Sequence, residues 1–156
     1  MVQEARQDGS IWLEEDFENY SVVEREPITI NFLGAQLTTA PPPSSGGTTI
    51  ATILNIISEF DFSGMETSAK AHLIVEAMRR AYRDRAFYLG DPDFVDIPIR
   101  KLISKEHALD LAQSIDMDVA TPIHMDDQLD GKLAWNEGAH TSHFSILDMN
   151  GNRAAV

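Results

Sequence analysis

The sequence predicts an α+β fold, because two different periodicities occur in separate parts of the chain. Apolar residues recur at helical spacing from residue 50 to residue 57 and again from 67 to 89. Short runs rich in β-branched residues flank Gly34, and a strand-like alternation returns at residues 143–147. With 156 residues, 43% of them hydrophobic, the chain is long enough to form one domain with its own core.

Composition excludes several classes of function. Twelve Lys and Arg against twenty-five Asp and Glu give a formal net charge of −13, which repels phosphate backbones, so no nucleic-acid partner is expected. The absence of cysteine excludes disulfides, thiolate metal sites and cysteine nucleophiles. No apolar run approaches the roughly 18 residues that a bilayer span requires, so no membrane span is expected in this segment.

The first third of the chain is predicted to hold a short helix followed by two strands. Residues 9–26 combine apolar side chains with acidic residues near the start, where a helix dipole favours negative charge. Pro27 ends any helix there. Strands are expected at 28–33 and 35–39, around Gly34.

The segment 41–47, Pro-Pro-Pro-Ser-Ser-Gly-Gly, is the strongest break in the sequence. A helix is expected directly after it, from the spacing of Ile50, Ile53, Leu54 and Ile57. The serines and glycines ahead of a helix could hold an anion. Because the pattern lacks the Gly-Lys-Ser/Thr of a phosphate loop, a rigid turn with an N-cap is the favoured interpretation.

The clearest predicted helix spans about residues 67–89. One face is predicted to be apolar, formed by Ile74, Ala77, Met78, Ala81, Tyr82, Tyr88 and Leu89, and the opposite face carries Glu76, Arg79, Arg80 and Arg83. Arg85 projects from the apolar face and needs a partner, because an unpaired buried charge is costly. Asp91 and Asp93 are the expected partners in a structural ion pair, with a clamp for a substrate carboxylate as the alternative.

The remainder of the chain is predicted to be a helix, an acidic loop and a hairpin. Ser104 is expected to cap a helix over residues 105–114, and residues 117–140 are predicted to form an exposed acidic loop. A strand at 143–147 is followed by Asn150-Gly151, a pair typical of tight hairpin turns, and the next strand begins at 153.

The acidic loop contains a partial match to a calcium-binding loop. Asp126, Gln128, Asp130 and Glu137 stand at ligand positions of that pattern. Gln128 is a weaker ligand than aspartate, and Pro122 and Gly138 disrupt the two flanking helices, so calcium is only a weak alternative and no metal is expected. His140 and His143 also do not form a metal site, since residues three apart on a strand point to opposite faces.

Residues 141–146, Thr-Ser-His-Phe-Ser-Ile, with Gly151-Asn152 following in step, resemble the start of the small subunit of the γ-glutamyltranspeptidases. That family consists of N-terminal-nucleophile hydrolases that cut their own precursor before a threonine. The resemblance extends upstream over nearly the whole chain, through blocks at 15–16, 19–20, 24–27, 41–47, 84–85 and 88–94.

The resemblance implies a domain assignment. Residues 1–140 correspond to the C-terminal part of the large subunit, with 117–140 as the acidic loop before the processing site, and residues 141–156 to the start of the small subunit. The implied fold is one incomplete domain of a four-layer αββα sandwich, mainly its helical layer plus short strands. The implied partners are the remainder of the large and small subunits, and family members are typically exported.

The resemblance also implies a mechanism. The Thr141 hydroxyl would attack the carbonyl of His140, and cleavage of the His140–Thr141 bond would free an α-amino group. Such a group, with an ordinary pKa of roughly 7.7–8.0, suits a general base near neutral pH. Thr141 would then carry a γ-glutamyl group from glutathione or another γ-glutamyl amide to water or an amine, without a cofactor.

The isolated 156-residue chain is expected to be inactive and unprocessed. The Thr-x-Thr segment that follows the nucleophile in the family, and the family's substrate-binding elements, are not among its residues. The alternative function is a non-catalytic acidic interaction module that keeps the helical layer.

Overall fold

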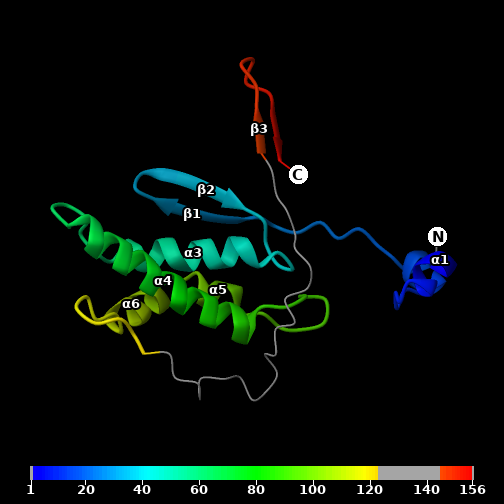
Figure 1. Ribbon diagram of the computed structural model, residues 1–156, viewed down its shortest axis with the longest axis horizontal. Coiled ribbons are helices and arrows are strands. Elements are labelled where there is room, and N and C mark those ends of the chain that lie inside the picture. The colour runs from blue at the N-terminus through cyan, green and yellow to red at the C-terminus, as the bar shows by residue number, and fades with distance from the viewer. Residues whose placement is uncertain (1, 123–144, 156) are drawn as a thin grey trace. The chain divides into compact units, whose positions relative to one another are not determined.

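The structure, a computed structural model, describes residues 2–122 and 145–155 (Figure 1). It divides into two units, one ending at Thr121 and one beginning at Pro122. Helices and two-stranded antiparallel sheets account for the regular structure of the described residues, as expected for a partial α+β fold.

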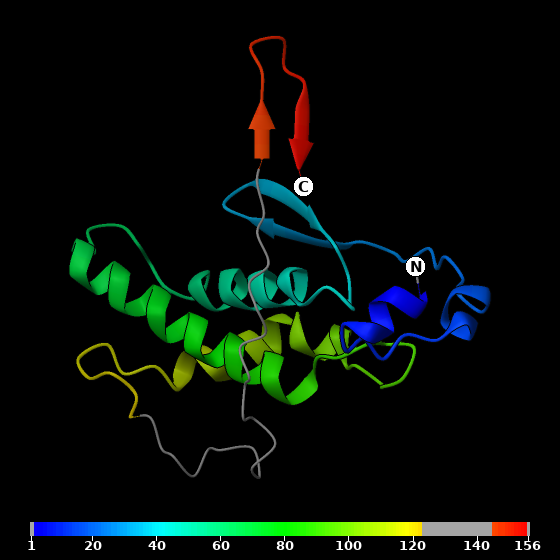
Figure 2. The ribbon, with the colours of Figure 1, turned by 45° about the vertical axis from the view of Figure 1, so that its right-hand side comes forward.

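The described residues of the first unit form six helices and one hairpin. In chain order these elements are α1 (Val2–Gln7), α2 (Glu14–Glu18), β1 (Ile28–Phe32), β2 (Ala35–Thr39), α3 (Ser45–Ile57), α4 (Thr67–Tyr88), α5 (Ile99–Leu102) and α6 (Lys105–Gln113). Helix α3 packs against α4 on one side and against strand β1 on another, and it also contacts α6 (Figure 2). No helix among the described residues is long and apolar enough to cross a membrane.

The main core lies between α3, α4 and α6. Its buried members are Ile56, Ile57, Leu73, Ala77, Ala108, Ala112 and Ile115. The three alanines allow the helices to approach closely, while Ile56 and Leu73 fill the space between them with no exposed surface. This core fixes the positions of α4 and α6, which carry the polar cluster described below.

The hairpin β1–β2 covers α3 through one face. Ile28 and Ile30 are buried and pack with Ala51 of α3, whereas the alternate residues Thr29 and Asn31 are exposed, as is typical of a half-buried strand. Leu33 and Gly34 both have positive φ and connect the paired residues Phe32 and Ala35. That geometry is a two-residue type I′ turn, and it explains the glycine between the strands.

The break before α3 is shaped by close backbone packing. A Cβ atom at Gly47 would lie 2.1 Å from the carbonyl oxygen of Ala40, so only glycine fits there. The predicted helix is confirmed, but it begins at Ser45, so the two glycines belong to its first turn. Ser44 occupies the N-cap position, yet its side chain makes no capping hydrogen bond.

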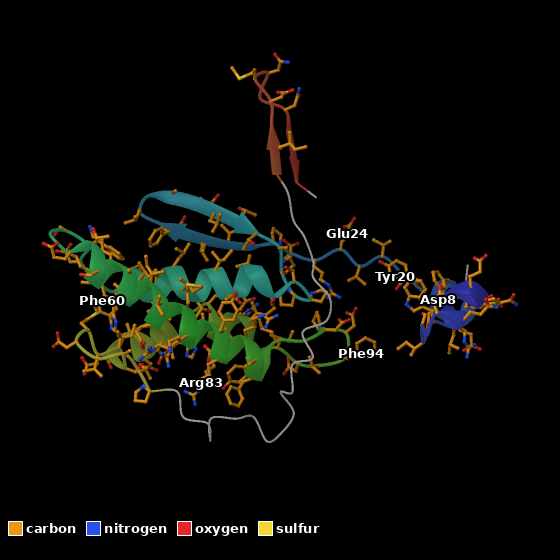
Figure 3. The ribbon with its side chains drawn as sticks, viewed as in Figure 1. Asp8, Tyr20, Glu24, Phe60, Arg83 and Phe94 are labelled. Atoms are coloured by element: carbon orange, nitrogen blue, oxygen red, sulfur yellow. The ribbon has the colours of Figure 1, made fainter. Side chains whose placement is uncertain are left out.

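The short helix predicted within residues 9–26 is confirmed as α2, and the residues around it are not helical. Gly9 has a φ of +89° just after α1, α2 covers only Glu14–Glu18, and Tyr20 and Glu24 lie on an extended segment that leads to β1 (Figure 3). The apolar residues of this region stay exposed, Ile11 at 91% and Phe17 at 46%. A short helix without a packing partner gains too little free energy from burial to extend, which explains why α2 stays short.

Helix α4 confirms the predicted span of 67–89 but not the predicted face. Ala77 and Ala81 are buried as expected, whereas Ile74, Met78 and Tyr82 are 40–53% exposed. Glu76 and Arg80, assigned to the solvent face, are 1% and 8% exposed. Helical periodicity predicts charged residues on the outer face, but these two side chains are buried because they satisfy each other inside the unit.

The predicted third helix is confirmed as α6, with Ser104 as its N-cap. The hydroxyl of Ser104 accepts a hydrogen bond from the backbone N–H of His107 at 3.1 Å. The short helix α5, just ahead of this cap, was not predicted.

The described part of the second unit is a hairpin, which confirms the predicted pairing. Strand β3 (Ser145–Leu147) pairs antiparallel with β4 (Arg153–Ala155), with Leu147 opposite Arg153. The connection therefore spans residues 148–152 and is longer than the two-residue Asn-Gly turn that the sequence suggested. Gly151, with a φ of +82°, supplies the left-handed position within it.

Candidate functional site

The residues predicted to carry chemistry lie outside the described ranges. This holds for the processing pair His140 and Thr141, and for the weak calcium set Asp126, Gln128, Asp130 and Glu137. The structure describes contacts of residues that precede this region in sequence and contacts of residues that follow it, in two separate units.

On the C-terminal side, Asp148 organises the hairpin that follows Thr141 in sequence. One oxygen of its carboxylate accepts backbone N–H groups of Asn150 at 2.8 Å and Asn152 at 2.9 Å. The other accepts the Asn152 Nδ2 amide at 2.6 Å. The side-chain hydrogen bond from Asn152, joined by its backbone bond, lowers the pKa of Asp148 below its usual range. The loop therefore holds β3 and β4 in one register.

On the N-terminal side, Glu76 binds the last residue of the first unit. Thr121 donates its backbone N–H to Glu76 Oε1 at 3.1 Å and its hydroxyl to Glu76 Oε2 in a short hydrogen bond. Arg80 Nη1 donates to the same Oε2 at 2.7 Å, and Arg79 Nη1 lies 3.6 Å from Oε1. Both carboxylate oxygens of a nearly fully buried side chain are thus satisfied.

Arg80 connects this carboxylate to the end of α6. Its Nε donates to the Ser114 hydroxyl at 2.7 Å and to the Leu111 carbonyl at 3.1 Å. Its Nη2 donates to the Ser114 carbonyl at 2.6 Å and to the Thr121 hydroxyl at 3.3 Å. A guanidinium at a helix C-terminus binds carbonyls that have no partner within the helix. We call Glu76, Arg80, Ser114 and Thr121 the exit cluster.

The electrostatics of Glu76 follow from two opposing effects. Burial alone raises the pKa of a carboxyl group, and it is the largest single influence here. The hydrogen bonds from Thr121 and Arg80, together with the positive charge of Arg80, outweigh it and lower the pKa of Glu76 from 4.5 to about 2. The carboxylate is therefore charged at neutral pH and paired with Arg80.

Two contacts of Arg85 lie outside the predicted pairing with Asp91 and Asp93. Its Nε donates to the Ser45 hydroxyl at 3.0 Å, and its guanidinium carbon lies 5.9 Å from the centre of the Tyr82 ring. Asp93, one of the two expected partners, accepts from Arg25 Nη2 at 2.7 Å on both oxygens. Two blocks 68 residues apart in sequence are therefore joined by an ion pair.

A second partly buried pair links α4 to α6. His107 Nε2 lies 2.6 Å from Asp84 Oδ2, with both side chains about 14% exposed or less. Across the described ranges, no group of three or more histidine and acidic side chains is arranged to hold a metal ion.

The family model for gamma-glutamyltranspeptidase matches residues 1–156. The chain belongs to the gamma-glutamyltranspeptidase family. The resemblance noted in its sequence blocks is thereby confirmed.

Individual relatives agree with this assignment. The chain is 40% identical over 158 residues to the glutathione hydrolase proenzyme of Escherichia coli strain K12, a match that covers 100% of this chain and 27% of that protein. It is 34% identical to an acylase ACY 1 proenzyme of Pseudomonas sp. strain V22, over 92% of this chain and 25% of the relative. The chain thus spans about a quarter of the length of these curated relatives.

A solved structure matches the fold. The gamma-glutamyltranspeptidase of Helicobacter pylori superposes with a TM-score of 0.71 at 37% identity, covering 88% of this chain and 40% of that one. This likeness confirms the partial α+β fold expected for the family.

The exit cluster is the feature of this family member that the sequence analysis missed. The signal was present, because Glu76 and Arg80 have the i, i+4 spacing of a helical ion pair. That spacing usually marks an exposed pair, and nothing in the sequence indicated that Thr121 would enclose it.

Proposed function

We propose that the chain is the part of a γ-glutamyl-transferring hydrolase precursor that contains its processing site, with Thr141 as nucleophile. The carrying observation is that the family match spans residues 1–156 and so includes the block that begins at Thr141. The proenzyme named among the relatives supports a chain that is made as a precursor.

In the proposed processing step, the Thr141 hydroxyl oxygen attacks the carbonyl carbon of His140. The peptide C–N bond breaks as the C–O ester bond forms, and the hydroxyl proton is transferred to the departing nitrogen, which becomes the α-amino group of Thr141. Water then hydrolyses the ester, leaving a carboxyl group on His140 and restoring the Thr141 hydroxyl.

In the proposed transfer step, the new amino group takes the Thr141 hydroxyl proton as the oxygen attacks the γ-carbonyl of the substrate. The amide bond breaks, the proton passes to the leaving amine, and a γ-glutamyl ester remains on Thr141. Water or a second amine then attacks that ester, releasing glutamate or a new γ-glutamyl amide. No cofactor enters either step.

The proposed substrates are glutathione and related γ-glutamyl amides. The support is the 40% identity to a glutathione hydrolase proenzyme, against 34% to an acylase proenzyme. No contact among the described residues favours a non-catalytic interaction module, so it is not carried forward.

The test uses the precursor expressed from the complete coding sequence that contains this chain. Wild-type protein is expected to be cut between His140 and Thr141 and then to release p-nitroaniline from γ-glutamyl-p-nitroanilide. Thr141→Ala is expected to do neither. Ser142→Ala is the matched control, because it removes the neighbouring hydroxyl, which has no role in either proposed step, and it is expected to do both. Cleavage of the Thr141→Ala precursor at this bond would refute the proposal.

We also propose that the 156 residues alone are neither processed nor active. The described hairpin has strands of three residues each, and a two-stranded hairpin is marginally stable by itself. Mass spectrometry of the isolated chain after prolonged incubation is expected to show one intact species. Two fragments divided at His140–Thr141 would contradict this expectation.

A further inference from the structure

The loop of the β3–β4 hairpin carries an asparagine–glycine pair that the proposed function does not use. This pair, Asn150 and Gly151, lies in the connection of residues 148–152 between the two strands, and both residues are exposed. In the whole sequence, Asn150 is the only asparagine followed by glycine. The pair is therefore a chemical feature of this hairpin as well as a turn signal.

The two asparagines of this loop are held in different ways. Asn152 donates its Nδ2 amide to Asp148 Oδ2 at 2.6 Å and its backbone N–H to Oδ1 at 2.9 Å. Asn150 donates its backbone N–H to Asp148 Oδ1 at 2.8 Å, but its side-chain amide makes no hydrogen bond to any described residue. One side-chain amide is thus bound within the loop, and the other is exposed and free to change its rotamer.

An asparagine side chain is open to attack by the backbone nitrogen of the next residue. The attack closes a small ring, and a side chain on that next residue obstructs the approach. Gly151 has no Cβ atom and therefore no such obstruction. Its φ of +82° also marks a position that residues with a Cβ atom rarely adopt.

One backbone hydrogen bond restrains the attacking nitrogen. The Gly151 N–H is donated to the Asp148 carbonyl oxygen at 3.1 Å, so the attack requires this bond to open. The loop is exposed and joins strands of only three residues each. A two-stranded hairpin of this kind is marginally stable, and local opening of such a region costs little free energy.

We propose that Asn150 is a site of spontaneous deamidation. The Gly151 nitrogen loses its proton to hydroxide and attacks the side-chain carbonyl carbon of Asn150. As the new C–N bond closes a succinimide ring, the bond from that carbon to Nδ2 breaks, and ammonia leaves with a proton taken from water. Water then opens the ring at either carbonyl, which leaves aspartate or isoaspartate at position 150. The inference does not depend on the proposed function.

The conversion changes the loop around Asp148. It adds a negative charge to a residue whose backbone N–H lies 2.8 Å from Asp148 Oδ1, and like charges within one short loop repel each other. The isoaspartate product also adds a main-chain carbon to the connection between Leu147 and Arg153, which are paired in the sheet. Both changes weaken the hydrogen bonds that hold β3 and β4 in register.

The experiment follows the precursor expressed from the complete coding sequence during prolonged incubation at neutral and at mildly alkaline pH. Peptide mapping by mass spectrometry measures the amide-to-acid conversion at positions 150 and 152. Position 150 is expected to convert at least about tenfold faster, because the Asn152 amide must first leave a charged acceptor and has no glycine after it. The rate at position 150 is expected to rise with pH, since the attacking nitrogen must lose its proton.

Two variants with the same chemical change provide the controls. Asn150→Gln lengthens the side chain, disfavours the succinimide ring and is expected to lose the conversion at this position. Asn19→Gln, at an exposed asparagine followed by tyrosine, is expected to leave the conversion at position 150 at the wild-type rate. Equal conversion at positions 150 and 152, no conversion at 150, or a conversion rate in Asn150→Gln that matches wild type would overturn the inference.

Discussion

The N-terminal segment and helix α4 of the same unit both mix apolar and charged residues, but only α4 forms a long helix. Residues 9–26 mix apolar and acidic side chains as α4 mixes apolar and basic ones, yet the first region forms only the short helix α2 while α4 runs for 22 residues. The difference lies in packing, because Leu73 and Ala77 of α4 contact α3 and α6, whereas Ile11 and Phe17 remain exposed. Amphipathicity therefore predicts a long helix only where another element covers the apolar face.

The largest change in the free energy of unfolding is expected from a substitution at Glu76, in the helical core. Glu76→Ala leaves Arg80 buried without its carboxylate, and breaking a buried pair in this way costs about 3–5 kcal/mol. Glu14→Ala, on the exposed face of α2, is the matched control and is expected to change stability by less than about 0.5 kcal/mol. Urea unfolding of the two variants measures both, and equal effects would break the contrast.

A smaller but still large effect is expected in the apolar core. Leu73→Ala removes a fully buried side chain between the helices and is expected to cost about 2–4 kcal/mol, from lost transfer energy and the cavity left behind. Ile11→Ala, at 91% exposure, is the control and is expected to be nearly neutral. A loss of more than about 1 kcal/mol in Ile11→Ala would show that the N-terminal segment has a packing partner.

The pH dependence of stability also distinguishes the two regions, with an effect of intermediate size. Because the pKa of Glu76 is about 2 in the folded state and 4.5 ordinarily, its charged form stabilises the fold above pH 4.5, and that contribution is lost as pH falls toward 2. The expected loss between pH 7 and pH 3 is about 2 kcal/mol. In Glu76→Gln this part of the pH dependence should disappear, whereas Glu14→Gln should retain it, as measured by denaturation at each pH.

The smallest effect concerns removal of the N-terminal helices. Deletion of residues 2–18 takes away α1 and α2 but leaves Arg25 and its ion pair with Asp93. The free energy of unfolding of the remaining chain, obtained from its unfolding midpoint, is expected to differ by no more than about 0.5 kcal/mol from that of the complete chain. A cooperative loss of the helical signal on deletion would contradict the description of this segment as peripheral to the core.

Sequence reasoning predicted most elements of the fold and the family, but not the way charged residues are used. The strands around Gly34, α3, α4 and the hairpin after residue 145 follow from local periodicity and turn residues. Burial of Glu76 and Arg80 could not be predicted, because it depends on Thr121, 45 residues further along the chain. The pairing of Asp93 with Arg25 was not predicted for the same reason, since a contact over 68 residues leaves no periodic signal.

The candidate nucleophile was identified in another way. The short segment around Thr141 does not indicate a nucleophile by itself. The blocks at residues 41–47 and 88–94 indicate the family, and the family resemblance then indicates Thr141. The structure describes residues that precede and follow it in sequence: Thr121, bound by Glu76, and the β3–β4 hairpin with its Asp148 loop.

The central claim is tested most directly by N-terminal sequencing of the smaller fragment from the matured full-length protein. The account predicts a single sequence that begins Thr-Ser-His-Phe-Ser, with Thr141 as its first residue. A fragment that begins at any other residue, or a fully active protein that remains one uncut chain, would contradict it.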